Sequence, residues 1–400
     1  MQHHQQIEID ARQIDHVDRS SFKTFTSSIW QRGPYGAVQS FPTQSFQVSR
    51  SDLAKVRWRD RTADGDLADS QVDVAIRRFA LTANNITYAR LGGSIPGLGF
   101  GYWDFFPSET GWGQIPVWGL ADIVASRHPA LEEGTALFGF FPMATHLRLT
   151  VDGVRGATVF EHSAHRRSLP ATYNQYLIAE RGLALSPEAM DAYMVLRPSF
   201  SLSFCCATYL SEQRWFDSRR ILISSASAKA AMGLAMLLAG EGLEVVGLTS
   251  AHRLGQVAAR AVCDRVLAYE DVASLPNNVP TVFIDIANAP TVTRAVHEHL
   301  QPGLRISIAA GFTHGADLGD RLPGPARQVF MAPAHMQRLQ AAWGTGVYWQ
   351  RFTEAWHRFH GLVSRHAAFV HTTGPANVER AYRQVLQGEV PDDIAHVLSL

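Results

Sequence analysis

Residues 219–253 read RRILISSASAKAAMGLAMLLAGEGLEVVGLTSAHR, and this stretch decides the class of fold. An apolar run, Ile221 to Ile223, ends in a string of small residues; a helical apolar pattern and a second apolar run at 243–248 follow. The order of strand, tight turn, helix and strand is typical of the first βαβ unit of a dinucleotide-binding fold. In such a unit the cofactor's pyrophosphate lies at the N-terminus of the helix, where N–H groups and the helix dipole favour an anion.

The turn of this unit lacks the glycines that usually let phosphates approach the backbone closely. No glycine occurs between Ser224 and Met232, and small residues stand in their place. We predict that four residues of the turn hold the pyrophosphate: Ser225, Ser227, Ala228 and Lys229. A structural turn that binds nothing remains the alternative, because serine and alanine also suit an ordinary α/β turn.

The end of the second strand favours NADP(H) over NAD. An acidic residue at this point usually bonds the ribose 2′-OH of NAD, but residues 247–253 read GLTSAHR and contain no Asp or Glu. We predict that Ser250 and Arg253 hold the 2′-phosphate, with Arg253 supplying a charged fork. The alternative is a helix start with Ser250 as its N-cap, and the two roles are compatible.

Composition narrows the functional classes. The 400 residues include 46% apolar and 18% charged residues, with 36 basic and 36 acidic side chains, so nothing draws the chain as a whole to nucleic acid or anionic lipid. No apolar run reaches the length of a membrane span, and residues 1–10 lack the apolar core of a secretory signal. The three cysteines form neither a metal spacing nor a disulfide framework, and we therefore expect a cytoplasmic protein.

Three regions differ in their patterns. Residues 1–190 are rich in candidate strands separated by Gly/Pro-rich loops. Residues 191–330 alternate strand and helix, which indicates a parallel sheet with right-handed crossovers. Residues 331–400 read as helices that end in a terminal strand. The fold class expected is α/β, with a β-rich domain and a doubly wound sheet.

The order and spacing of six short motifs along the chain are informative. They lie at residues 80–88 (ALTANNITY), 133–139, 173–178, 198–203, 285–288 (DIAN) and 302–305 (PGLR). This order resembles the zinc-independent, quinone-oxidoreductase-like branch of the medium-chain dehydrogenase/reductase superfamily, in a divergent form of a family of unknown function. The resemblance implies a GroES-like domain at 1–190 completed by 331–400, a Rossmann domain at 191–330 and a cleft between them. It also implies a homodimer.

The resemblance also implies roles for residues outside the turn. Tyr88 and His314 are candidate proton donors, and Asn85, with its neighbour Asn84, is a candidate for orienting substrate. Five further positions correspond to cofactor contacts: Ser203, Ala287, Asn288, Gly311 and Thr313. A buried structural phenol at Tyr88 and turn formation by the asparagines remain the alternatives.

The chain departs from the zinc-dependent members of that superfamily. It has no cysteine before Cys205, and Trp118 to Asp122 stand where those members carry a Gly-His-Glu motif, so we expect no catalytic zinc. The function predicted is NADPH-dependent hydride transfer to a carbonyl or an α,β-unsaturated carbonyl of a small molecule. Two alternatives stay open: a lyase or isomerase that uses bound NADP(H) without net redox change, and a non-catalytic protein with a decayed cofactor site.

Three further clusters carry expectations. Residues 152–170 read as an insertion, which we expect to be a solvated loop although it contains His162, His165 and Arg166. The aromatic stretch at 100–107 is expected to line an apolar or aromatic substrate pocket. His146 is expected to be a structural histidine.

Overall fold

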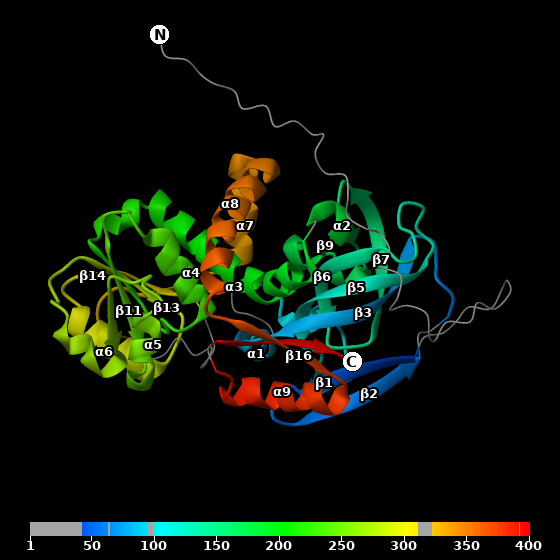
Figure 1. Ribbon diagram of the computed structural model, residues 1–400, viewed down its shortest axis with the longest axis horizontal. Coiled ribbons are helices and arrows are strands. Elements are labelled where there is room, and N and C mark those ends of the chain that lie inside the picture. Colours follow the sequence, from blue (N-terminus) through cyan, green and yellow to red (C-terminus); the bar gives the residue numbers. More distant parts are fainter. Residues whose placement is uncertain (1–41, 63–64, 94–98, 184, 311–321, 392) are drawn as a thin grey trace, which may run out of the picture. The chain divides into compact units, whose positions relative to one another are not determined.

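The βαβ unit lies at the centre of a six-stranded parallel sheet (Figure 1). This computed structural model describes residues 42–400 except 63–64, 94–98, 184, 311–321 and 392, and Ser40–Leu400 form one compact unit. The strands of the parallel sheet are β10 (Arg220–Ile223), β11 (Glu244–Thr249), β12 (Arg265–Ala268), β13 (Thr281–Asp285), β14 (Leu304–Ala309) and β15 (Arg327–Val329). Their order, β12-β11-β10-β13-β14-β15, is the doubly wound order in which the first strand neighbours the second and the fourth.

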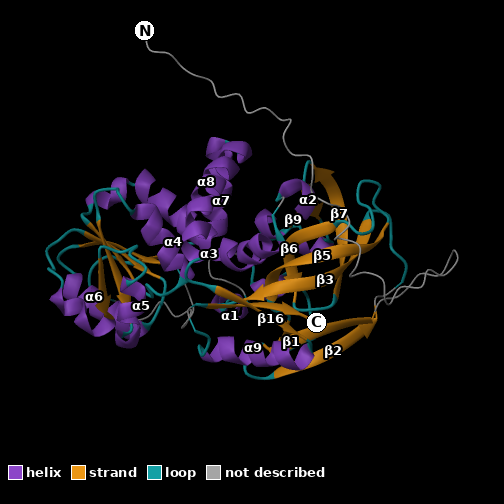
Figure 2. Ribbon diagram, viewed as in Figure 1, coloured by secondary structure: helices purple, strands orange, loops and turns teal. Residues whose placement is uncertain are grey.

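The central strands of this sheet are buried on both faces. All residues of β10 and β13 are buried, as expected where helices cover both sides of a parallel sheet. The helices that connect strands β10 to β14 of this sheet are α4 (Lys229–Leu238), α5 (Leu254–Ala258) and α6 (Pro290–Leu300) (Figure 2). The carboxyl ends of β10, β11 and β13 therefore meet at one edge of the sheet, which is where such folds bind ligands.

The second sheet has eight strands in the order β16-β17-β3-β5-β6-β9-β8-β7. A further pairing between β3 and β7 closes six of these strands into a barrel. The strands are β3 (Gln71–Leu81), β5 (Pro116–Ser126), β6 (Ala136–Pro142), β7 (His146–Arg155), β8 (Thr158–Glu161), β9 (Gln175–Ile178), β16 (Ala368–Thr373) and β17 (Ile394–Ser399). The two strands from the end of the chain thus extend the barrel at β3, and α9 (Pro375–Gln387) connects them (Figure 1).

Smaller elements complete the β-rich part. A three-stranded antiparallel sheet has the order β2-β1-β4 and consists of β1 (Pro42–Ser49), β2 (Val56–Thr62) and β4 (Trp112–Gly113). Two short helices, α1 (Ala83–Arg90) and α2 (Ala179–Gly182), follow β3 and β9. The predicted α/β class, with a β-rich domain and a doubly wound parallel sheet, is confirmed.

One long helix, α3 (Pro187–Glu212), runs from the barrel to the parallel sheet. It begins at a favourable N-terminus, because the Ser186 side chain accepts a hydrogen bond from the Ala189 N–H and Pro187 occupies the first turn. It contacts β3, β5 and β17 near one end, and α4 and α7 (Ala332–Trp343) as well. The boundary expected near residue 190 therefore falls inside a helix.

Aromatic packing attaches the helical tail to α3. On α8 (Thr345–Val363) the buried residues Tyr348, Phe352, Trp356 and Phe359 share one face. The Phe359 ring stacks on Phe200 of α3 with centroids 4.6 Å apart. Trp356 thus belongs to the core, and Trp343 and Trp349 of the tail are partly buried against it. Among the described residues no helix is both long and apolar enough to cross a membrane.

The segment at 152–170 is not a solvated loop, and this expectation was wrong. β7 continues to Arg155 and pairs with β8 in a hairpin, whose end leads to a buried Arg166. The Arg166 guanidinium donates to Asn174, Tyr176 and the Tyr173 carbonyl, and its Nε lies 3.3 Å from Glu161 Oε2. Hairpin pairing satisfies the backbone, and burial of this charge network holds the segment in place.

We predict that Arg166→Met destabilises the fold by about 3 kcal/mol, because it leaves the Glu161 carboxylate buried without its cation. The matched variant Arg167→Met removes an exposed neighbouring charge and is expected to change stability by less than about 0.5 kcal/mol. Urea unfolding followed by circular dichroism measures both. Equal stabilities of the two variants would contradict this account of the segment.

Candidate functional site

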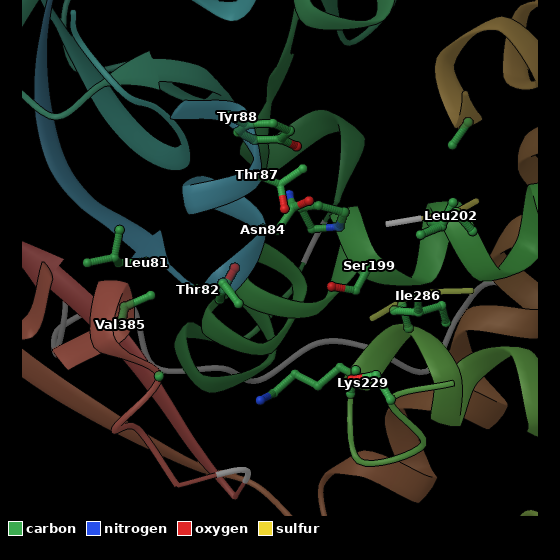
Figure 3. A pocket seen from close by; sticks show the side chains of 18 of the residues that line it. Leu81, Thr82, Asn84, Thr87, Tyr88, Ser199, Leu202, Lys229, Ile286 and Val385 are labelled. Carbon is green, nitrogen blue, oxygen red and sulfur yellow. The ribbon is translucent and has the colours of Figure 1, made fainter. Parts of the chain in front are cut away.

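A cavity of about 520 Å³ opens where the βαβ turn, α1, α3 and the end of α9 come together (Figure 3). The residues that the structure describes along it come from α1 and the residues before it, the tyrosine cluster, α3, the βαβ turn, the strand ends and the tail. They include Thr82, Asn84, Thr87, Tyr88, Leu91, Tyr102, Tyr173, Pro198, Ser199, Leu202, Ser225, Ser227, Ala228, Lys229, Arg253, Ile286, Ala310, Phe330 and Val385. Among these described lining residues none is acidic, and Lys229 and Arg253 are cations.

The α1 helix places Tyr88 at this cavity. Asn84, Thr87, Tyr88 and Leu91 are spaced three or four residues apart, so a helix brings them to one face, and all four line the cavity. Asn85 lies on the opposite side of the same turn. Its side chain accepts the Thr82 N–H at 2.8 Å and donates to the Pro116 carbonyl at 2.9 Å.

Asn85 is therefore engaged in fixing the start of α1 and does not line the cavity. The helix assigns the position at the cavity to Asn84, whose side chain points into it in Figure 3.

The βαβ turn takes a backbone conformation that glycine usually supplies. Ser225 has φ = 53°, in the left-handed region, and its N–H donates to the Tyr269 hydroxyl at 3.2 Å. Helix α4 then begins at Lys229 with Ala228 as N-cap and no side-chain capping bond. The helix start thus faces the cavity with small side chains around it, as an anion site requires.

Two cations flank this helix start. In Figure 3 the Lys229 side chain extends across the cavity at the end opposite Tyr88. Arg253, from the end of the second strand, donates from Nη1 to Ser227 Oγ at 3.3 Å, and Arg260 donates to the Ser227 carbonyl at 2.8 Å. Ser250 caps the short helix that holds Arg253, accepts the Arg253 N–H at its carbonyl, and is not among the lining residues.

A buried hydroxyl joins the ends of β10 and β13. Ser224 donates to Asp285 Oδ1 at 2.8 Å and accepts the N–H groups of Ile286 and Ala287 at 2.9 and 3.0 Å. Asp285 is fully buried and pairs with Arg327 at 3.0 Å. Ser224 was not among the residues predicted for the site. Its position directly after an apolar strand was the available sign that its hydroxyl could bond the neighbouring strand end.

This network also accounts for two predicted cofactor contacts. The Asn288 N–H donates to Asp285 and its side chain accepts from Arg327, so the bend after β13 is held from both sides. Ala287 and Asn288 are buried and lie behind Ile286, the residue of this bend that reaches the cavity. Their predicted contacts to a cofactor stay predictions.

Ser203 joins two helices. Its hydroxyl donates to the Ala230 carbonyl of α4 at 2.7 Å. A Cβ added at Gly233 of α4 would lie 2.8 Å from the Ser203 Oγ, so the two helices pack closely here. The lining positions of α3 are instead Pro198, Ser199 and Leu202. The sequence signal for them was available, since Ser199 and Leu202 are three residues apart on one helical face.

An aromatic cluster forms the end of the cavity around Tyr88. The Tyr102 and Tyr173 hydroxyls are 3.0 Å apart, and the rings of Tyr88 and Tyr102 are 4.4 Å apart. Burial raises the pKa of the Tyr88 phenol above its usual value, and bonds from Trp118 and neighbouring polar groups act in the opposite direction. Tyr88 is therefore protonated at neutral pH and is able to donate a proton.

The aromatic stretch divides between two cavities. Tyr102 lines the cavity described above, whereas Phe105, Phe106 and Pro107 line a second one of about 810 Å³. His146 also lines the second cavity, and burial lowers the pKa of its imidazole. It therefore lies away from Tyr88.

The structure does not describe three of the predicted site residues. Gly311, Thr313 and His314 lie outside the described residues. Within the part of the chain that the structure describes, no three His, Cys, Asp or Glu side chains are grouped to hold a metal ion.

Several solved structures have a similar fold. The chain is similar to CurA from Vibrio vulnificus at 12% identity, with a TM-score of 0.51 and coverage of 89% of this chain and 98% of that one. The CurK enoyl reductase matches at 13% identity and TM-score 0.51, with 89% and 99% covered. A mutant form of the enoyl thioester reductase from Candida tropicalis matches at 11% identity and TM-score 0.50, with 90% and 100% covered. No curated protein matches the sequence.

At these identities the likeness shows the fold alone, and it is the two-part α/β fold that the resemblance read from the sequence implied. The chain belongs to the family described as "Protein of unknown function (DUF2855)", whose profile matches residues 79–391. That match includes α1, α3 and the βαβ turn.

We predict that Ser225→Gly keeps or raises stability by up to about 1 kcal/mol, whereas Ser225→Val costs about 2 kcal/mol. The reason is the positive φ at this position, which glycine adopts freely and a β-branched residue does not. Urea unfolding of the protein without ligand gives both values. A valine variant as stable as wild type would show that Ser225 does not hold this conformation.

Proposed function

We propose that this protein is an NADPH-dependent oxidoreductase that reduces a carbonyl or an α,β-unsaturated carbonyl of a small, uncharged molecule. The observation that carries the proposal is that one cavity joins the start of α4, with its two cations, to the Tyr88 hydroxyl. One end suits a phosphorylated cofactor, and the other offers a proton donor in an apolar wall.

The donor set at the α4 end fits a dinucleotide. Ser225, Ser227 and Ala228 surround the helix start and Lys229 supplies a charge, so they would hold the pyrophosphate. The turn needs no glycine for its backbone conformation, since Ser225 already has the left-handed φ. This argues against the reading in which loss of the glycines means a decayed site.

The choice of NADP(H) over NAD(H) rests on charge. β11 ends without an acidic residue, and Arg253 lines the cavity just beyond it. A guanidinium there would pair with the negative charge of the 2′-phosphate. An unphosphorylated ribose carries no such charge, so the guanidinium would favour NADP(H). CurA, which shares the fold, has been solved in complex with NADPH, and two other similar structures are named as enoyl or enoyl thioester reductases.

The chemistry divides between cofactor and protein. The bound nicotinamide supplies a hydride to the substrate. Tyr88 would donate a proton to the anion that results, while Asn84, one turn of α1 earlier, and Thr87, which precedes Tyr88, would hydrogen-bond the substrate oxygen. The aromatic rings of Tyr102 and Tyr173 exclude water from this end and accept a substrate with an apolar body.

A thermal-shift titration with NADPH, NADP⁺, NADH and NAD⁺ tests cofactor binding. At a hundred times its Kd a cofactor stabilises the fold by about 2.7 kcal/mol. We expect NADPH and NADP⁺ to stabilise wild type more than the other two. Arg253→Ala removes this difference, Lys229→Ala weakens all four, and Arg294→Ala, an exposed cation on α6, changes nothing. No stabilisation by any dinucleotide would overturn the proposed function.

Turnover is tested with enones, quinones and aldehydes by following NADPH consumption. We expect Tyr88→Phe to lower kcat by about 10²-fold or more without changing NADPH affinity, because it removes only the proton donor. Tyr209→Phe, on α3 but away from the cavity lining, serves as the matched control. Conversion of substrate without NADPH consumption would favour the lyase or isomerase reading instead.

A further inference from the structure

Arg197 of α3 is a buried cation without a carboxylate partner. The residue is 6% exposed, its Nε has no hydrogen-bond partner, and within the described chain no carboxylate oxygen lies within 4 Å of its guanidinium. Burying an uncompensated charge costs several kcal/mol in general, so a fold that keeps one has a reason to keep it. Two more deeply buried guanidiniums, those of Arg166 and Arg220, each have a carboxylate partner.

Aromatic rings take the place of the missing carboxylate. The guanidinium carbon lies 4.9 Å from the ring centroid of Trp118, 5.4 Å from Trp349, 5.5 Å from Tyr193 and 5.7 Å from Phe138. These rings come from β5, α8, α3 and β6, so the cage forms only in the folded protein. Ring faces attract the cation without neutralising its charge, and its field therefore reaches beyond the cage.

One ring of the cage contacts Tyr88. The Trp118 Nε1–H donates to the Tyr88 hydroxyl oxygen, with the two atoms 3.4 Å apart. The Arg197 guanidinium lies over the same indole and polarises its N–H toward that oxygen. Arg197 also immediately precedes Pro198 and Ser199, which line the cavity.

Among the described groups that lower the pKa of the Tyr88 phenol, Arg197 is the charged one. The other groups that act on it are Trp118, Asn84 and the neutral hydroxyls of Tyr102 and Tyr173. Burial raises the pKa of Tyr88, whereas Trp118, Asn84, Tyr173 and the Arg197 charge lower it. Burial raises the pKa of Tyr102 and Tyr173 strongly, so these two remain neutral.

We propose that Arg197 is a positioning residue whose buried charge, acting directly and through Trp118, stabilises the anionic form of Tyr88 and thereby makes it the proton donor. The inference rests on the proposed function. When the Tyr88 O–H bond breaks, the proton forms a new bond to the anion produced by hydride addition, and the negative charge stays on the phenolate oxygen. A proton from water later restores the phenol. The Trp118 N–H and the Arg197 cation stabilise that phenolate where water is excluded.

The first test does not need turnover. Difluorotyrosine, a more acidic tyrosine, is placed at position 88, and its ionisation is followed by fluorine NMR in the protein without cofactor. We expect the midpoint of ionisation to rise in Arg197→Met, to stay near the wild-type value in Arg197→Lys, and to be unchanged in Arg351→Met. Arg351 is the matched control because its guanidinium also lies over a tryptophan, 4.5 Å from the Trp343 centroid, but it is exposed.

A wild-type comparison covers the case in which Arg197→Met does not fold. Difluorotyrosine at position 88 is expected to ionise at lower pH than the same residue at position 102 or 173, because Arg197 and Trp118 favour only the Tyr88 anion. A folded Arg197→Met protein with an unchanged midpoint overturns the inference. So does an order in which position 88 is not the first to ionise.

Kinetics separate this inference from the proposed function. In an enzyme that turns over, Arg197→Met is expected to lower kcat about tenfold or more and to change the KM for NADPH by less than about twofold, with recovery in Arg197→Lys. Failure of wild type to bind NADPH contradicts the proposed function, whereas the fluorine titration still decides the role of Arg197. An unchanged kcat in folded Arg197→Met overturns the inference alone.

Discussion

The hydrogen bond from Ser224 to Asp285 is the interaction on which the site depends. It joins the carboxyl ends of β10 and β13, the two strands between which the doubly wound order reverses. Because Ser224 also accepts the N–H groups after β13, one buried hydroxyl aligns the turn before α4 with the bend that carries Ile286. The start of α4 and the floor of the cavity therefore keep their relative positions without a glycine-rich loop.

The opposite end of the cavity is built on a different principle. It consists of aromatic side chains from α1, β5, β6 and the segments around Tyr102 and Tyr173, with hydroxyls aimed at one another and little access for water. In such surroundings charges interact over longer distances than in solvent. An end of the cavity with the two cations Lys229 and Arg253 and an apolar end with the Arg197 guanidinium behind it are therefore complementary, and the chemistry proposed here uses both.

Two corrections have the same physical origin. Asn85 was a candidate for orienting substrate, yet Thr82 and Asn85 form a capping pair that starts α1, and the helix then turns Asn85 away from the cavity and Tyr88 toward it. Residues 152–170 read as a polar insertion, yet Arg166 finds buried acceptors that are supplied by Asn174, Tyr176 and the Tyr173 carbonyl. In both cases a polar residue has partners beyond its own segment, which local pattern alone does not reveal.

The sequence by itself determined the α/β class, the βαβ unit and the absence of an acid after its second strand, because apolar periodicity and small-residue turns are local properties. It also indicated Lys229, Arg253 and Tyr88, and the structure brings all three to one cavity. Only the tertiary structure decided that Ser203 packs between helices, that Ser224 joins two strands and that Arg197 lies within four aromatic rings. These depend on contacts between residues far apart in the chain, and a linear pattern contains no record of such distances.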